Sequence, residues 1–349
     1  MQRFYNIEFL RFLCALAVAI YHWGISFELM KMDSNETFSH VLNIIYDYGD
    51  KAVPVFFVIS GLVFANVYLS KTQNETLYNF SIKRLARLYP LHILTLFLIL
   101  FLQILFLKIY GKFELYTFND FYHFFLNLTF LLGWMFEYGR SFNSPVWTVG
   151  QEIFVYFIFF FLIFYIKKYR IKLVFLVYLI FLFIDKMNYI ELNFIKNFIY
   201  LNYFIDFIRL FFSGVFIFLI INKIRYPKLL TLLSLLLLAF SFLGSFKLHL
   251  FCFSLVLLFV LLDKLNLSEK LKKCFTFLGS LTYSIYLLHT FTFLIFLFFL
   301  KLLDKVDLFY SEITFVVYII FTLFLSIISF KFFENRMNKI IRNRLLSYK

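Results

Sequence analysis

Arg11 and His22 lie in one apolar run near the N-terminus, FLRFLCALAVAIYHWG. The run is hydrophobic enough to enter a bilayer, where an arginine costs about 2.5–3.5 kcal/mol and therefore usually marks a lined cavity or a functional pathway. Eleven residues of α-helix turn through about 1100°, some 20° more than three full turns, and rise about 16 Å. The spacing therefore predicts that the guanidinium and the imidazole share one helical face at two depths in the membrane.

Two further ionisable side chains lie in apolar runs. Glu152 belongs to SPVWTVGQEIFVY, and His289 belongs to LGSLTYSIYLLH. A carboxylate that is ionised within a bilayer needs a cation or a hydrogen-bond donor. Arg11, His22 and Arg209 are the candidate partners of Glu152, and the sequence alone does not choose among them.

Two helical spacings have a structural interpretation as well as a functional one. Asp206 and Arg209 are three residues apart in FIDFIRLFFSG, so we expect them to neutralise each other as a structural pair. Tyr283, Tyr286 and His289 recur every three residues and form a slanting polar stripe. This stripe is either packed against other helices or lines the path of an acceptor.

Arg84 and Arg87, in SIKRLARLYP, face the same side of a helix. Two forked guanidiniums suit a phosphate group, but any basic pair would serve as a cytoplasmic anchor, and charge alone favours the anchor. Ser60 and Gly61 form a small pair inside VPVFFVISGLVF. Such a pair usually permits close helix packing, and it would also clear space beside a ligand.

The composition is that of a helical membrane protein without a separate soluble domain. Of the 349 residues, 63% are hydrophobic and 57 are Phe, and the mean hydropathy is +0.86, more apolar than a soluble core absorbs. The cysteines Cys14, Cys252 and Cys274 form no CxxC pair, so we expect neither a disulfide framework nor a metal site. Phosphate-binding glycine loops and hydrolase or zinc motifs are absent from the sequence.

Hydropathy predicts an all-α, polytopic bundle of about ten transmembrane helices. Their approximate bounds are 9–29, 52–70, 88–107, 146–166, 173–184, 198–221, 229–243, 248–262, 274–300 and 313–333. The first run has no small-residue cleavage site, so we interpret it as a retained span. With both termini cytoplasmic, most of the 34 Lys and Arg residues fall on the cytoplasmic side, as the positive-inside rule requires. The net charge of +14 is then mainly topological, and we expect no nucleic-acid partner.

The run 120–136 is an eleventh candidate span, but crossing there would move most basic residues outside. We therefore place it in a long outer segment, 108–145, where it is interfacial or re-entrant. We assign 1–335 to the transmembrane domain and 336–349 to a short basic cytoplasmic tail.

Six motifs, in order along the chain, resemble those of the integral-membrane acyltransferase 3 family, which includes bacterial O-antigen and exopolysaccharide O-acetyltransferases. They are NIEFLRFLCALAVAIYHW, VPVFFVISGLVF, IKRLARLYP, SPVWTVGQEIFVY, LGSLTYSIYLLH and FFENRMNKIIRNR. The chain departs from the family pattern at Thr148 and Val149, where Ser-Leu is usual, at Ala52 in place of a common glycine, and at Asn335-Arg336, where a proline generally follows shortly. None of these departures removes a proposed reactive group, but they leave the acceptor preference open.

The resemblance implies transfer of an acyl group, most often acetyl, from cytoplasmic acyl-CoA to a hydroxyl of a cell-envelope saccharide, in the bacterial inner membrane. Acetyl-CoA would be the donor substrate, and no metal is implied. The acceptor would be a polysaccharide or a lipid-linked saccharide among membrane lipids.

The implied catalytic residues are His22, Glu152 and Arg11. His22 would be the general base or would carry the acyl group, and Glu152 would orient it or the acceptor. Arg84, Arg87 and Arg11 would hold acyl-CoA, and the substrate-lining residues would be Ser60, Trp147, Tyr286 and His289.

Two other functions fit parts of the sequence. A transporter or flippase of a lipid-linked or small hydrophobic molecule explains ten spans and buried charges equally well. It predicts internal repeats, and none is evident between 1–170 and 171–349. A structural subunit of an envelope assembly accounts for neither the basic pair nor Arg11 with His22.

Overall fold

The computed structural model describes most of the chain, and most of the described residues lie in helices. The described residues are 3–29, 45–46, 48–69, 75–165, 176, 199–221, 227–243, 247–264 and 267–346, and no strand occurs among them. The chain divides into two compact units. The first unit contains Met1–Cys14, Lys51–Glu75 and Gln151–Gly279, and the second contains Ala15–Asp50, Thr76–Gly150 and Ser280–Lys349.

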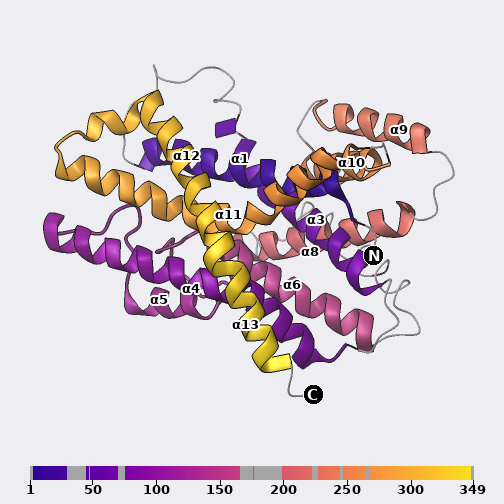
Figure 1. Cartoon of the computed structure of the whole chain (residues 1–349), viewed down its shortest axis with the longest axis horizontal. Coiled ribbons are helices and arrows are strands. Elements are labelled where there is room, and N and C mark those ends of the chain that lie inside the picture. Colours follow the sequence, from indigo (N-terminus) through magenta and orange to yellow (C-terminus); the bar gives the residue numbers. More distant parts are fainter. Residues whose placement is uncertain are drawn as a thin grey trace. The chain divides into compact units, whose positions relative to one another are not determined.

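Seven helices in the described part of the chain are long and apolar enough to cross a membrane (Figure 1). They are α1 (Tyr5–Leu29), α3 (Ala52–Tyr68), α4 (Leu77–Tyr110), α6 (Val146–Tyr165), α8 (Ile199–Ile221), α11 (Glu269–Leu302) and α12 (Glu312–Ile328) with its extension. Two shorter apolar helices are α9 (Pro227–Phe240) and α10 (Leu248–Leu262). The expected polytopic helical bundle is confirmed. The predicted span 173–184 lies, apart from residue 176, outside the described residues.

The run 120–136 does not form a spanning helix. It contains only α5 (Phe121–Leu128), followed by turns. Eight helical residues rise about 12 Å, whereas the hydrocarbon core is about 30 Å thick. The α4–α6 segment, residues 111–145, therefore connects two long helices without crossing the membrane again.

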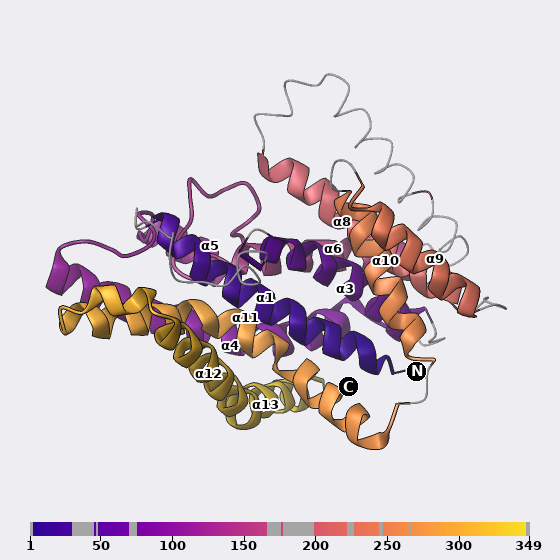
Figure 2. The ribbon, with the colours of Figure 1, turned by 90° about the horizontal axis from the view of Figure 1, so that it is seen from above.

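In the first unit, α3 packs closely against α8. A methyl group added at Gly61 would overlap the carbonyl oxygen of Phe211, and one added at Gly214 would overlap that of Val58. The glycine predicted to permit close packing does so, and α8 supplies a second one that the sequence did not single out. Helix α10 packs against α9, α8 and α3, and α9 runs beside α10 in both views (Figures 1 and 2).

In the second unit, the apolar core gathers around Trp23, which is fully buried. The indole stacks on Phe309 with ring centroids 4.3 Å apart, and it contacts Tyr318 with centroids 4.6 Å apart. Because Trp23 follows His22 directly, this packing fixes the turn of α1 that carries the imidazole.

The last long helix continues past the predicted span. Helix α12 leads through a π-helical turn, η4 (Ser329–Glu334), into α13 (Asn335–Leu346), as Figure 1 shows. Helix α13 packs along α4, and the hydroxyl of Tyr78 donates a hydrogen bond to the carbonyl of Leu345 over 3.1 Å. Most of the segment assigned to a basic tail, 336–349, is therefore helical and packed.

Candidate active site

His22 and His289 are the two imidazoles that the second unit brings together. Their rings stack with centroids 5.1 Å apart and planes inclined by 29°. His22 comes from α1 and His289 from α11, and the backbone carbonyl of His289 accepts from the hydroxyls of Thr292 and Tyr318. A neutral imidazole can accept the proton of a hydroxyl group, so a histidine held in a fixed orientation is a candidate general base.

Two hydroxyl side chains contact each other near this pair. One is Tyr286, on α11 three residues before His289, and the other is Thr148, on the first turn of α6. The Tyr286 and Thr148 oxygens are 2.6 Å apart, and they lie 2.9 and 3.1 Å from the carbonyl oxygen of Pro145. One of the two hydroxyls therefore donates to the Pro145 carbonyl, and the other donates to the first hydroxyl. The Tyr286 ring also contacts His289 edge-on, with centroids 6.0 Å apart. Trp147, another predicted lining residue, lies in the same turn of α6, directly before Thr148.

Asn143 and Thr95 are buried polar residues of this region that sequence reasoning missed. The Asn143 amide donates to the Leu287 carbonyl over 3.1 Å and to the Thr95 hydroxyl over 3.3 Å. It thereby joins the α4–α6 segment to α4 and α11 beside His289. The only signal in the sequence was a polar residue directly before Ser144-Pro145, at the start of a helix.

Glu152 and Ser60 meet in the first unit, as two predicted site residues on different helices. The Ser60 hydroxyl donates to Glu152 Oε1 over 2.5 Å, and the Tyr156 hydroxyl donates to the same oxygen. Glu152 forms no ion pair with the described residues of its own unit. Of the three expected partners, Arg11 and Arg209 each have a different carboxylate, so two hydroxyl donors replace the expected cation there.

Arg11 forms an ion pair with Glu8, one turn earlier on α1, over 3.1 Å. The start of α1 is held by α10, because Asp263 Oδ1 accepts from the backbone N–H of Asn6 over 2.8 Å and from its side-chain amide over 3.0 Å. The first N–H groups of a helix have no acceptor within it, so Asp263 caps α1 from another helix. Burial raises the pKa of the Asp263 carboxyl to about 6, although the Asn6 hydrogen bonds oppose the shift.

Arg84 and Arg87 lie on the side of α4 that carries buried residues. Phe80 and Leu88, one turn before and one turn after Arg84, are buried, and the Nε atom of Arg84 is buried as well. Leu91, one turn after Arg87, is fully buried. A cation that only marks the cytoplasmic surface points outward to headgroups or water. Arg84 and Arg87 are themselves partly exposed, so this face does not choose between binding and an anchor.

The expected pair between Asp206 and Arg209 is confirmed, with a separation of 2.9 Å. A third member, His249 on α10, brings its Nε2 to 3.4 Å from the same Asp206 oxygen. Arg209 is buried while Asp206 is partly exposed. The cluster ties α8 to α10, which is the structural interpretation favoured by the sequence.

The closing motif of the chain contacts the motif on α11. The Ser284 hydroxyl donates to Glu334 Oε2 over 2.7 Å, and both side chains are buried. Glu334 ends the π-helical turn, a local distortion that is often found at functional sites. Tyr283, the residue before Ser284, donates a hydrogen bond from its hydroxyl to the Leu88 carbonyl over 2.5 Å. Leu88 lies two residues before Pro90, inside α4.

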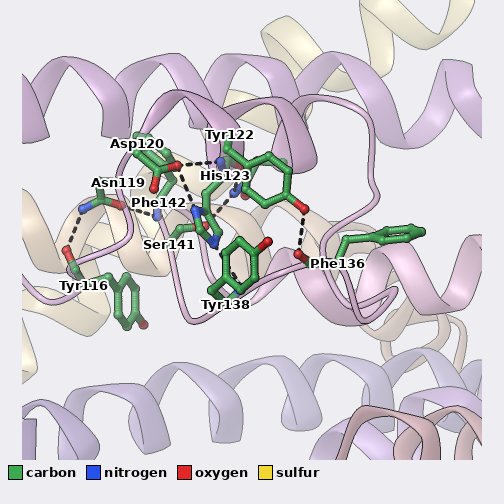
Figure 3. Close-up of polar contacts among 10 residues, drawn as sticks. Tyr116, Asn119, Asp120, Tyr122, His123, Phe136, Tyr138, Ser141 and Phe142 are labelled. Carbon is green, nitrogen blue, oxygen red and sulfur yellow. Dashed lines mark hydrogen bonds and ion pairs between the residues drawn. The ribbon is translucent and has the colours of Figure 1, made fainter. Parts of the chain in front are cut away.

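The α4–α6 segment is ordered by its own polar network, which Figure 3 shows. Asp120 caps α5 by accepting from the backbone N–H of His123, and it lies 2.8 Å from the His123 ring nitrogen Nδ1. The N–H of Tyr138 donates to Nε2, so the ring proton is on Nδ1. Although burial of Asp120 opposes the shift, its hydrogen bonds with His123 hold its carboxyl pKa below the ordinary value.

The predicted site residues therefore lie in four places, two in each unit. His22, His289, Tyr286 and Trp147 belong to the second unit, as do Arg84 and Arg87 on α4; Ser60, Glu152 and Arg11 belong to the first. Within the first unit, Glu152 joins Ser60, whereas Arg11 pairs with Glu8. Among the described residues, no group of three His, Cys, Asp or Glu side chains is arranged to hold a metal ion.

Comparison with known families gives one match. A family model described as an acyltransferase domain, Acyl_transf_3, matches residues 4–332. Comparisons with curated proteins and with solved structures give no match. The matched range contains every site residue predicted from the sequence, and it ends two residues before Glu334.

Proposed function

The chain belongs to the acyltransferase 3 family of membrane proteins, and on that premise we propose that it transfers an acetyl group from cytoplasmic acetyl-CoA to a hydroxyl of a cell-envelope saccharide. The observation that carries this proposal is the stacked pair His22 and His289, set beside the Tyr286 and Thr148 hydroxyls. An imidazole next to hydroxyl groups is a suitable site for moving the proton of an alcohol.

In the proposed reaction, His22 acts as the general base. The acceptor hydroxyl loses its proton to the imidazole, its oxygen forms an ester bond with the acyl carbon, and the carbon–sulfur bond of the thioester breaks. The CoA thiolate then takes the proton from the imidazolium, so atoms and charge balance. General base catalysis of this kind contributes about 10²–10⁴-fold in rate.

A covalent route uses the same residue differently. The His22 nitrogen would first bond to the acyl carbon while the carbon–sulfur bond breaks and the CoA thiolate leaves. The acceptor oxygen would then form the ester while the carbon–nitrogen bond breaks, and the hydroxyl proton would go to the thiolate. His289 serves both routes, because the stacked ring restrains the His22 side chain. The two routes differ in one observable: only the second leaves an acylated histidine when the acceptor is withheld.

We assign donor binding to Arg84 and Arg87, with Arg11 as a third cation. The fork geometry of guanidinium matches the phosphates of CoA. Glu152 would position the acceptor, since Ser60 and Tyr156 hold one of its oxygens.

The proposed setting is the bacterial inner membrane, crossed several times, with the acceptor reaching His22 from the outer side. The acceptor would be a polysaccharide or a lipid-linked saccharide. Positive residues concentrated on one side of the predicted spans support this orientation.

The test is acyl transfer by the purified protein in liposomes. Radiolabelled acetyl-CoA and an envelope saccharide extract should give alkali-labile label on the saccharide, and His22→Ala should not. With acceptor withheld, labelled His22 in a peptide digest would select the covalent route. Movement of a lipid-linked saccharide that does not depend on acyl-CoA, without label transfer, would instead favour the transporter.

A further inference from the structure

The end of the α4–α6 segment is fixed directly beside the imidazole pair. Asn143 bonds to the Leu287 carbonyl of α11, two residues before His289, and the Pro145 carbonyl lies 2.9 Å from the Tyr286 hydroxyl. Arg140 comes three residues before Asn143. Its backbone leads directly into the stretch that is anchored to α11, the helix that carries His289, and His22 stacks on the His289 ring.

The backbone between these residues is unusually constrained. Phe142 has a backbone φ of +40°, a value that residues other than glycine rarely adopt. Its ring is buried, and its N–H donates to Asn119 Oδ1 over 2.7 Å (Figure 3). A strained residue persists only where its surroundings over-determine it. The residues around Arg140 therefore adopt one defined arrangement.

The carboxylates of the α4–α6 segment all have other partners. Glu114 forms an ion pair with Lys301 of α11, and its backbone is bonded on both sides by Gln103. Asp120 is bonded to His123. Glu137 Oε1 accepts from the N–H of Gly133 over 2.9 Å. None of these three carboxylates forms an ion pair with Arg140.

Arg140 is the cation that remains. It is exposed, and it forms neither a hydrogen bond nor an ion pair with any residue in the described parts of the chain. Arg140 therefore carries a permanent positive charge that is open to solvent, in the stretch of chain that Asn143 anchors to α11 two residues before His289.

We propose that Arg140 binds an anionic group of the acceptor saccharide, a carboxylate or a phosphate, and so presents the neighbouring hydroxyl to His22. This inference rests on the proposed acyl transfer, which it extends by naming the acceptor as acidic. A guanidinium accepts either oxyanion in a bidentate fork. Because Arg140 is exposed, it suits recognition of the acceptor, whereas a group that stabilises the reacting carbonyl has to be shielded from water.

The test measures binding and transfer separately. The full chain, in nanodiscs of phosphatidylcholine, is titrated with oligogalacturonate, with a phosphorylated mannan oligosaccharide and with a neutral maltooligosaccharide, using surface plasmon resonance. The variants are Arg140→Gln, Arg140→Lys and the control Lys112→Gln, which removes an exposed charge of the same segment.

Wild type and Lys112→Gln should bind an anionic probe more tightly than the neutral one. Arg140→Gln should weaken anionic binding about tenfold, the effect of losing one charge-assisted hydrogen-bonded contact. Arg140→Lys should be intermediate, because it keeps the charge and loses the fork.

Equal binding by wild type and Arg140→Gln would overturn the inference, as would wild type that does not prefer an anionic probe. Loss of that preference when phosphatidylglycerol is added to the nanodisc would assign Arg140 to lipid headgroups and would also overturn it. Intact Arg140-dependent binding in a protein that transfers no acetyl group would contradict the proposed reaction alone.

Discussion

The imidazole rings of His22 and His289 lie face to face, with centroids 5.1 Å apart, although the residues are on α1 and α11. The contact is buttressed on both helices. Trp23 packs into the core directly after His22, and Tyr318 donates to the carbonyl of His289 over 3.4 Å. The orientation of the proposed base is therefore set by a second ring as well as by its own helix.

Replacing His289 should slow transfer without preventing membrane insertion. His289→Leu removes the stacked ring, and we expect kcat to fall by up to about 100-fold, as a misplacement of about 1 Å in the reacting group can do. His289→Phe keeps a ring, so its kcat should fall less than that of His289→Leu. Acetyl-transfer kinetics with purified variants measure both. Equal losses in the two variants would show that the ring nitrogens, not the stacking, are what His289 supplies.

Arg84 and Arg87 should determine the affinity for the donor. The double change to Ala should raise KM for acetyl-CoA about tenfold or more, because two charge-assisted contacts to phosphate are lost. A matched control is Arg336→Ala with Lys339→Ala, since these exposed cations lie on α13, which packs along α4. If the two double variants had the same KM, the basic pair would be an anchor.

Much of the site was predictable where it depends on one helix. The shared run of Arg11 and His22, and the pairing of Asp206 with Arg209, follow from helical spacing and from the expense of charge in a bilayer. The membrane spans were predictable from hydropathy for the same reason, because the hydropathy of a span depends only on the residues within it.

Contacts between helices were not predictable. Glu152 needed a partner, and the sequence suggested a cation, but Ser60, 92 positions away, meets it instead. Ser284 and Glu334 are 50 positions apart in the sequence, and Glu334 lies at the end of a π-helical turn. The hydrophobic periodicity of the sequence does not predict this turn. Arg140 lies in an irregular segment, where neither helical nor strand periodicity places a side chain.

The close approach of α3 and α8 should make Gly61 and Gly214 intolerant of change. Gly61→Ala or Gly214→Ala would place a methyl group against the backbone of the other helix. Overpacking of this kind costs about 1–3 kcal/mol. Unfolding in mixed micelles of increasing SDS content measures it. Val63→Ala, on a partly exposed position of α3, is the control and should differ little from wild type.

Asp263 should make stability depend on pH. Its folded pKa of about 6 lies above the unfolded value of about 3.9, so its contribution is complete below the unfolded value and is lost as pH rises through about 6. Asp263→Asn keeps an acceptor for Asn6 and does not titrate. Thermal unfolding of both proteins between about pH 4 and pH 8 should therefore show wild type losing stability relative to Asp263→Asn as the pH rises from about 4 to about 6, with a constant difference between the two proteins above that. Parallel curves would contradict the assignment.

The central claim is that His22 performs acetyl transfer to an envelope saccharide. The most direct measurement is the O-acetyl content of surface glycans, determined by mass spectrometry, in cells that lack the protein and in cells complemented with wild type or with His22→Ala. We predict that wild type restores the acetyl esters and that His22→Ala, although inserted in the membrane at the same level, does not. Normal acetylation by His22→Ala would contradict the account.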